Sequence, residues 1–207
     1  MSVAKKQLIA CFLALSLFSA MPVNPAAAQS KGKRVYTNVV PFITDGRIPG
    51  GPCMRISGDI TAPDFFTGLT RIGTPDGFEF RRGKEFVTEF PQELTLHLQI
   101  RDFPCMGSFE AAAPRRFLTQ QIVGALALHF YWKRGFALRP LKNVTRTKAT
   151  ALPLAPISNQ DTGDPVERFV WRFEFAVPSA GVPLTDHLVI VLRTAEGKLV
   201  ARVSARL

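Results

Sequence analysis

The stretch Glu93–Phe103, "ELTLHLQIRDF", decides the fold class of this 207-residue chain. Leu94, Leu96, Leu98 and Ile100 alternate in it with polar residues. Successive side chains of a β-strand point to opposite faces, so a period of two predicts a strand with one buried face. The stretch therefore indicates a sheet whose inner side packs in a core.

The same alternation recurs downstream. "FVWRFEFAV" places Phe169, Trp171, Phe173 and Phe175 on one face, and "GALALHFYWKRG" does the same with Leu126, Leu128, Phe130 and Trp132. Turn residues separate such runs, and hairpins are expected at Arg82-Gly83-Lys84 and at Glu196-Gly197. The run Leu188–Leu192 is apolar throughout, which is typical of a central strand covered on both faces.

Helical signals are few. One short helix is expected around Leu118 to Val123, and the proline-rich stretch Leu152–Glu167 is predicted to be a long exposed loop. Many short strands with turns between them predict an all-β, antiparallel β-sandwich, immunoglobulin-like in the broad architectural sense, with at most one short helix. No tryptophan lies between Cys53 and Cys105, so the antibody-type signature is absent and no family is inferred.

The N-terminus has the features of a cleavable signal peptide. Lys5 and Lys6 precede an apolar stretch, Leu8–Met21, and the small residues Ala26–Ala28 follow it. We expect residues 1–28 to be removed and residues 29–207 to form a single β-sandwich domain. The protein is then exported, periplasmic or extracellular. No later segment is apolar and long enough to span a membrane.

The tripeptide Pro-Cys-Met occurs twice, at Cys53 and at Cys105. An exported chain meets an oxidising compartment, so a Cys53–Cys105 disulfide is expected. The alternative is a Cu(I)-handling site that also uses Met54 and Met106, because thiolates and thioethers suit Cu(I). Adjacent residues on a strand point apart, which opposes that alternative, and no metal or cofactor is predicted.

The positive charge is concentrated in one region. The full chain carries a net charge of +10, yet residues 111–160 contain no Asp or Glu. Most of the cations there lie in "KRGFALRPLKNVTRTK", which supplies the candidate anion-binding residues Lys133, Arg134, Arg139, Lys142, Arg146 and Lys148. Such a segment attracts anionic partners, although basic residues on an edge strand also prevent aggregation.

Catalytic patterns are not apparent. Glu85, Glu89 and Glu93 recur every four residues in a segment that alternates as strand, which favours a solvated face. His97 and His129 would form a metal site only if their strands were neighbours. The sequence therefore predicts no enzyme. A hydrolase assembled from distant residues is the remaining alternative, which sequence alone does not exclude.

The resulting hypothesis is an exported, non-enzymatic binding or structural module of the cell envelope or extracellular space. Its basic segment would dock an anionic envelope component, such as a lipid headgroup or an acidic glycan, or an acidic protein surface. Nucleic acid is not expected as a partner because the protein is exported and Phe136 is the one aromatic residue within the basic segment. The hypothesis leaves open membership of a larger assembly.

Overall fold

The computed structural model describes residues 33–36, 39–103, 117–158 and 163–207, which belong to one compact unit, Lys33–Leu207. The predicted signal peptide, residues 1–28, lies outside the described residues. Strands dominate the described chain, and their pairing is antiparallel throughout. The predicted all-β, antiparallel sandwich is confirmed.

The larger sheet has five strands in the order β10-β11-β7-β3-β2. Their bounds are Val39–Arg47 for β2, Cys53–Thr61 for β3, Glu93–Asp102 for β7, Thr145–Ser158 for β10 and Pro165–Pro178 for β11. The strand β7, where the sequence argument began, lies at the centre. Its apolar residues Leu94, Leu96, Leu98 and Ile100 are buried, as their spacing predicted.

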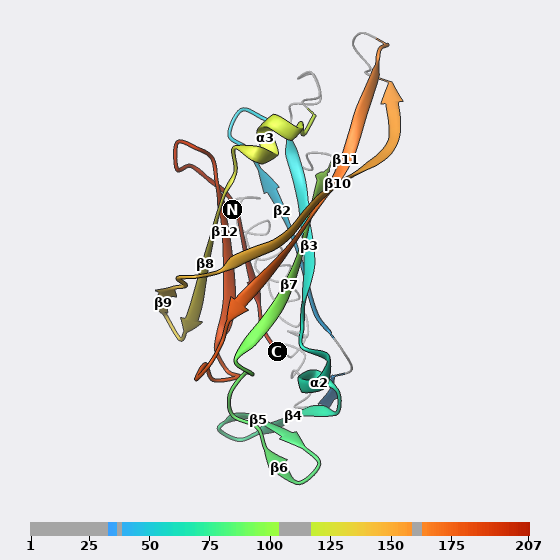
Figure 1. Cartoon of the computed structure of the whole chain (residues 1–207). Coiled ribbons are helices and arrows are strands. Elements are labelled where there is room, and N and C mark those ends of the chain that lie inside the picture. The colour runs from blue at the N-terminus through green and yellow to red at the C-terminus, as the bar shows by residue number, and fades with distance from the viewer. Residues whose placement is uncertain (1–32, 37–38, 104–116, 159–162) are drawn as a thin grey trace, which may run out of the picture. The chain divides into compact units, whose positions relative to one another are not determined.

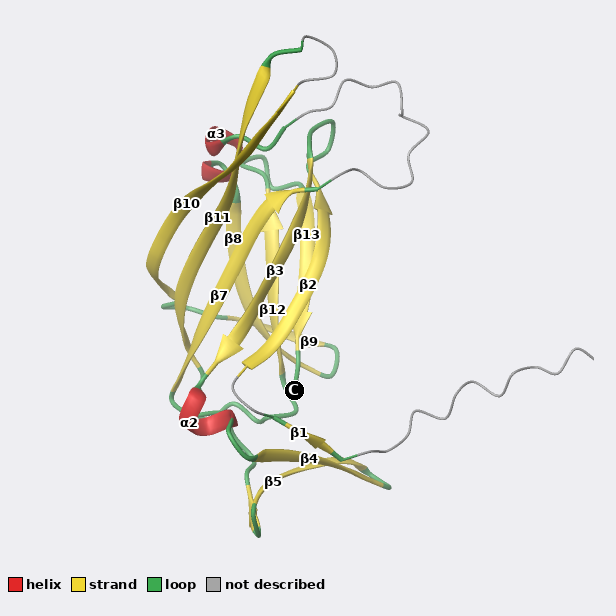
Figure 2. Cartoon of the chain, turned by 90° about the vertical axis from the view of Figure 1, so that its right-hand side faces the viewer, coloured by secondary structure: helices red, strands yellow, loops and turns green. Residues whose placement is uncertain are grey.

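The second main sheet has four strands in the order β13-β12-β8-β9. Their bounds are Ala127–Arg134 for β8, Ala137–Pro140 for β9, His187–Arg193 for β12 and Leu199–Ala205 for β13. Figure 2 shows this sheet behind the five-stranded one. The residues Leu188–Leu192 of β12 are all buried, which confirms the prediction of a strand covered on both faces.

A third, smaller sheet has the order β1-β4-β5-β6. Its strands are Arg34–Val35 for β1, Leu69–Thr74 for β4, Gly77–Arg82 for β5 and Glu85–Phe86 for β6. Two short helices, α2 at Pro63–Phe66 and α3 at Gln120–Gly124, accompany the sheets. The short helix expected near residues 118–123 is present as α3, whereas α2 was not anticipated, so the limit of one helix was wrong.

The inner faces of both main sheets contribute to one hydrophobic cluster. Phe130 from β8 and Phe175 from β11 meet across it, with ring centroids 5.1 Å apart. The edges of the two sheets also meet at Gly46 on β2. A Cβ added there would lie 2.9 Å from the Cβ of Ala201 on β13, so only glycine allows this close approach.

The predicted loop at Leu152–Glu167 is mostly strand. Strand β10 continues through Pro153 and Pro156 to Ser158, and β11 begins at Pro165. Proline lacks the N–H that a sheet ladder needs, but an edge strand has one side that bonds to no neighbour. Because β10 is the edge of its sheet, it accommodates these prolines, with a register shift between Leu154 and Ile157.

Candidate docking site for an anionic partner

The hairpin β8–β9 carries the start of the predicted basic segment. β8 pairs with β9 from Tyr131 to Arg134, and Gly135 and Phe136 form the turn between them. Gly135 has a φ of 54°, a left-handed conformation that glycine adopts without a steric penalty. Strand β9 is the outer edge of its sheet (Figure 1), so the turn is open to solvent.

The side chain of Phe136 is fully exposed at the tip of this hairpin. Leu138, two residues later, is 41% exposed. Basic residues flank them on both strands, with Lys133 and Arg134 before the turn and Arg139 after it. A fully exposed aromatic side chain among cations resembles the anchors of proteins that bind at membrane interfaces, where aromatic rings sit at headgroup level.

Arg134 differs from its basic neighbours because it is bound to a buried carboxylate. Its Nε lies 3.0 Å from Oδ1 and 3.1 Å from Oδ2 of Asp186, whose side chain is 3% exposed. The hydrogen bond and charge of Asp186 raise the pKa of Arg134 above its usual value. Arg134 therefore fixes the hairpin to the segment before β12, and its charge is already neutralised.

The other cations of this region differ from Arg134 in their surroundings. Within the part of the chain that the structure describes, no carboxylate lies within 4.0 Å of Lys133, Arg139 or Lys142. Arg139 and Lys142 are exposed, and Lys133 is half-buried. These three residues therefore retain uncompensated positive charge.

More positive charge continues onto the outer face of the four-stranded sheet. His187 on β12 pairs with Lys133 across the ladder. Burial first, then the positive charges of Arg206 and Lys133, lower the pKa of His187, while Asp186 opposes them. The Oγ of Ser204 lies 3.5 Å from Nδ1 of His187. Burial, and then the neighbouring cations, therefore disfavour the charged imidazole.

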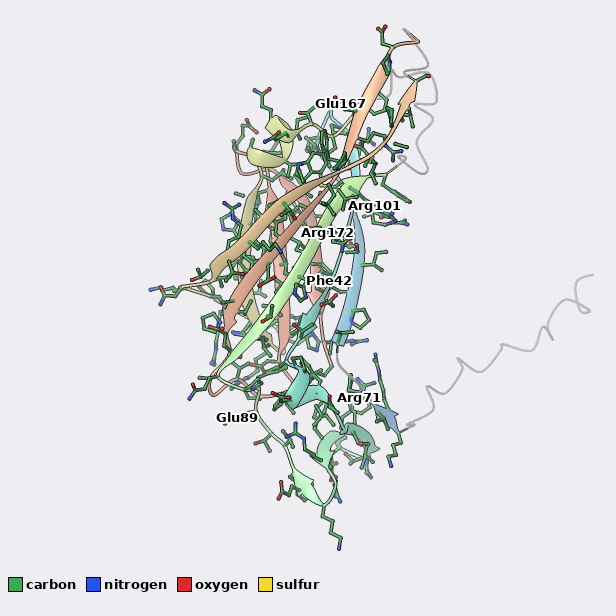
Figure 3. The ribbon with its side chains drawn as sticks, turned by 45° about the vertical axis from the view of Figure 1, so that its right-hand side comes forward. Phe42, Arg71, Glu89, Arg101, Glu167 and Arg172 are labelled. Carbon is green, nitrogen blue, oxygen red and sulfur yellow. The ribbon has the colours of Figure 1, made fainter. Side chains whose placement is uncertain are left out.

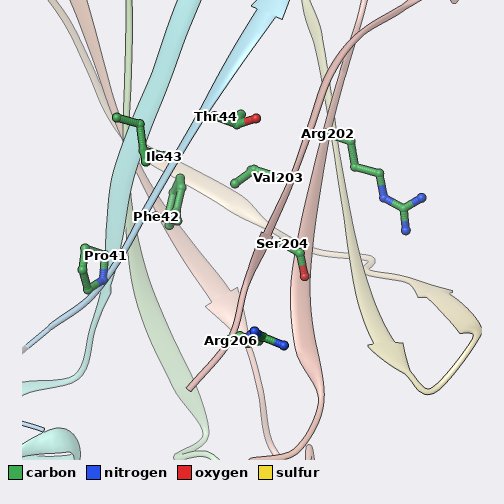
Figure 4. A pocket seen from close by; sticks show the side chains of 8 residues that line it. All are labelled: Pro41, Phe42, Ile43, Thr44, Arg202, Val203, Ser204 and Arg206. Carbon is green, nitrogen blue, oxygen red and sulfur yellow. The ribbon is translucent and has the colours of Figure 1, made fainter. Parts of the chain in front are cut away.

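A shallow pocket of about 260 Å³ lies where the edge strands β2 and β13 approach each other (Figure 4). Arg202, Ser204 and Arg206 point away from the core residues Phe42 and Val203 there. The alternation along β13 thus places two further arginines on the same outer face as Lys133. These two arginines were not predicted as binding residues because they lie far from the basic segment in the sequence.

The remaining two predicted anion-binding residues, Arg146 and Lys148, lie on β10 and point to opposite sides of it. Arg146 pairs in register with the core residue Phe175, whereas Lys148 pairs with Glu174 on the outer face. The six predicted residues therefore do not form one patch. Arg139 pairs with Trp132, so it lies on the same face of the hairpin as Arg134, whereas Lys133 lies on the opposite, outer face. Lys142 follows β9, and Arg146 and Lys148 lie on β10.

The outer face of the five-stranded sheet holds charges of both signs. Arg55 bonds to Asp45 at 2.8 Å, and Nδ1 of His97 lies 2.8 Å from Asp59. Arg101 on β7 and Arg172 on β11 are exposed cations of neighbouring strands (Figure 3). These two arginines were not predicted as binding residues either, although they occupy the polar positions of the alternating strands.

The two histidines considered for a metal site do not meet. His97 lies on β7 and His129 on β8, and these strands belong to different sheets. In the described residues, no group of three or more His, Cys, Asp or Glu side chains could hold a metal ion. Glu85, Glu89 and Glu93 are exposed, as expected for a solvated face.

The Pro-Cys-Met repeats are described only in part. Cys53 is the first residue of β3 and takes part in at least one interaction. Cys105 and Met106 lie outside the described residues. The Cys53–Cys105 disulfide therefore stays a prediction. The side chain of Met54 is fully buried in the hydrophobic cluster, whereas Cys53 is half-buried. This placement opposes a copper site in which Cys53 and Met54 converge.

No protein-family model, no curated protein and no solved structure matches this chain. No helix in the described ranges is apolar and long enough to cross a membrane.

Proposed function

We propose that this protein is an exported, non-enzymatic binding module that docks on an anionic lipid surface through the β8–β9 hairpin. The observation that carries the proposal is the fully exposed Phe136 flanked by Lys133 and Arg139, which have no carboxylate partner among the described residues. A cation near an anionic bilayer contributes about 1 kcal/mol of binding free energy. An aromatic ring at the interface adds to this attraction.

Three contacts fix the orientation of the hairpin. Arg134 is held by Asp186, and the backbone N–H of Leu141 donates a hydrogen bond of 2.8 Å to the backbone carbonyl of Phe130. The indole of Trp132 donates to the carbonyl of Pro178 at 3.2 Å. A rigid hairpin loses little conformational entropy on binding, so more of the interaction energy contributes to affinity.

Lipid vesicles provide the direct test. The purified protein should bind vesicles of phosphatidylglycerol and phosphatidylcholine, should bind pure phosphatidylcholine weakly, and should dissociate as salt rises. The double variant Lys133→Glu and Arg139→Glu should weaken binding at least about tenfold. The matched control, Arg101→Glu and Arg172→Glu, makes the same change in net charge on the five-stranded sheet and should bind nearly as the parent does.

Three results would overturn this assignment. The first is equal loss of binding in both double variants, since the hairpin would then have no special role. The second is binding to heparin without binding to the anionic vesicles, which would replace the lipid with an acidic glycan. The third is binding to neither, with capture of an acidic protein from the same compartment.

Export and the disulfide are tested separately. The protein secreted by its source should begin near Gln29, which N-terminal sequencing detects. Thiol titration of freshly purified material should find no free thiols. Free thiols together with bound copper would instead support the Cu(I) alternative, and neither result depends on vesicle binding.

A further inference from the structure

A second pocket, separate from the hairpin, opens between the two main sheets beside α3. Its volume is about 260 Å³. Ile100, Trp171 and Phe173 of the five-stranded sheet form one side, and Leu128 of β8 contributes to the other. The pocket lies where the aromatic inner face of β11 reaches the edge of the sheet.

Strand β10 creates the space. Ala149 pairs with Phe173 and Ala151 pairs with Trp171, so small side chains lie opposite large aromatic ones. Both alanines are exposed, although their Cβ atoms belong to the face that is directed inward. A larger residue at either position would fill the pocket.

Arg146 lines this apolar pocket and supplies its charge. Its guanidinium carbon lies 5.9 Å from the ring centroid of Phe173. None of the lining residues is acidic. The charge of Arg146 is therefore complementary to an anionic group placed on the apolar surface beside it.

Trp171 forms part of the wall of this pocket. The residue is 4% exposed, and its buried indole N–H has no hydrogen-bond partner among the described residues. Buried tryptophan N–H groups usually find an acceptor. Because this N–H has almost no accessible surface, the part of Trp171 that a ligand contacts is its apolar ring.

We propose that this pocket binds a small amphipathic anion of the medium-chain fatty-acid class. The hydrocarbon chain would lie on Trp171, Phe173 and Leu128, and the carboxylate would accept hydrogen bonds from Arg146. Pockets for drug-sized ligands measure about 300–1,000 Å³, so this smaller pocket suits a single short chain. The proposal does not depend on membrane docking, because none of these residues lies in the paired part of the β8–β9 hairpin, residues 131–140.

Calorimetric titration with decanoate and with decanol tests the proposal. These probes share a chain length and differ in charge. Arg146→Gln should weaken decanoate binding about fivefold and leave decanol binding unchanged, as expected for a partly exposed ion pair. Lys148→Gln is the matched control, because Lys148 lies on the same strand but faces Glu174 on the outer side, and it should change neither affinity.

Ala151→Leu should fill the pocket and weaken both probes at least about tenfold. Circular dichroism checks that this variant folds. Absence of decanoate binding to the parent protein would overturn the proposal. Equal effects of Arg146→Gln and Lys148→Gln would also overturn it, because the carboxylate would then not bind at Arg146.

Discussion

Two hairpins of this protein share nearly the same turn and differ in what surrounds it. Phe80–Phe86 reads "FRRGKEF" and Trp132–Leu138 reads "WKRGFAL". Each places an aromatic residue and two basic residues before a glycine of positive φ, 61° at Gly83 and 54° at Gly135. Sequence composition alone would assign them the same role.

The β5–β6 hairpin uses its arginines internally. Arg81 bonds to Glu79 at 2.7 Å and lies 4.2 Å from the ring centroid of Phe86. Arg82 contacts the backbone carbonyl of Phe65 and lies over its ring. Phe86 is 62% exposed under its arginine. Arg81 and Arg82 are therefore both engaged by groups within the protein.

The β8–β9 hairpin leaves its side chains available. Arg134 has a carboxylate partner, whereas Lys133 and Arg139 have none in the described residues, and Phe136 is fully exposed. The comparison shows that neutralisation by neighbours, rather than basic composition, distinguishes a structural hairpin from a candidate docking hairpin.

The largest expected effect is on stability, from Arg134→Met. This change leaves the buried carboxylate of Asp186 without its cation, which is more costly than losing an exposed pair. We expect the midpoint of thermal unfolding to fall by about 5 °C. Arg81→Met removes a pair in which both side chains are about one third exposed, and it should lower the midpoint by less than about 2 °C.

Equal shifts in these two variants, measured by circular dichroism, would contradict the view that the β8–β9 hairpin is fixed by Arg134. In that case its presentation would depend on backbone pairing alone.

The next effect is on vesicle binding. Phe136→Ser should weaken binding to phosphatidylglycerol vesicles about tenfold, because the ring then no longer enters the interface. The unfolding midpoint should not change, since the ring contacts solvent only. Phe86→Ser is the matched control in the other hairpin, and co-sedimentation should show unchanged binding. A loss in both variants would remove the difference between the two hairpins.

A smaller effect concerns the turns, where the hairpins should behave alike. Gly135→Ala and Gly83→Ala each place a Cβ in the left-handed region and should each cost about 1 kcal/mol of unfolding free energy. Urea denaturation measures both. Because the turn geometry is shared, a clear difference between the two costs would mean that the hairpins differ in backbone as well as in neighbours.

The periodicity of the strands predicted much of the fold. The burial of alternate residues in β7 and β8, the apolar β12 and the glycine turns follow from local side-chain patterns. These features are local because each depends on which face of a strand a residue occupies. The loop assigned to Leu152–Glu167 failed because proline content does not reveal which strand is an edge, and edge position depends on tertiary pairing.

The candidate site was predicted only in part for the same reason. The basic segment predicted Lys133 and Arg139 as binding residues. The buried carboxylate of Asp186, which neutralises Arg134, lies far from it in the sequence, so this pairing depends on the tertiary structure. Arg146 and Lys148 are close in sequence, yet the register shift between Arg146 and Lys148 accompanies their placement on opposite sides of β10. The density of charged residues along a sequence does not show which face of a strand each residue occupies when a bulge interrupts the alternation.

The smallest expected effect is on the pKa of His187, and it should again differ between variants of the two hairpins. The pKa of His187 is lowered by burial and then by the charges of Arg206 and Lys133. Lys133→Glu replaces a repulsive charge with an attractive one, so it should raise the pKa of His187 in an NMR titration. Lys84→Glu makes the same charge change in the β5–β6 hairpin and should leave that pKa unchanged.

The same shift has a consequence for stability. A histidine with a lowered folded pKa binds protons more weakly than it does in the unfolded chain, so stability falls as pH drops below about 6.5. Lys133→Glu should reduce the contribution of His187 to this loss, because the folded protein then accepts the proton more readily. Urea denaturation at pH 7.5 and 5.5 measures the difference. An unchanged pH dependence, together with an unchanged pKa of His187, would mean that the charge of Lys133 does not act on His187.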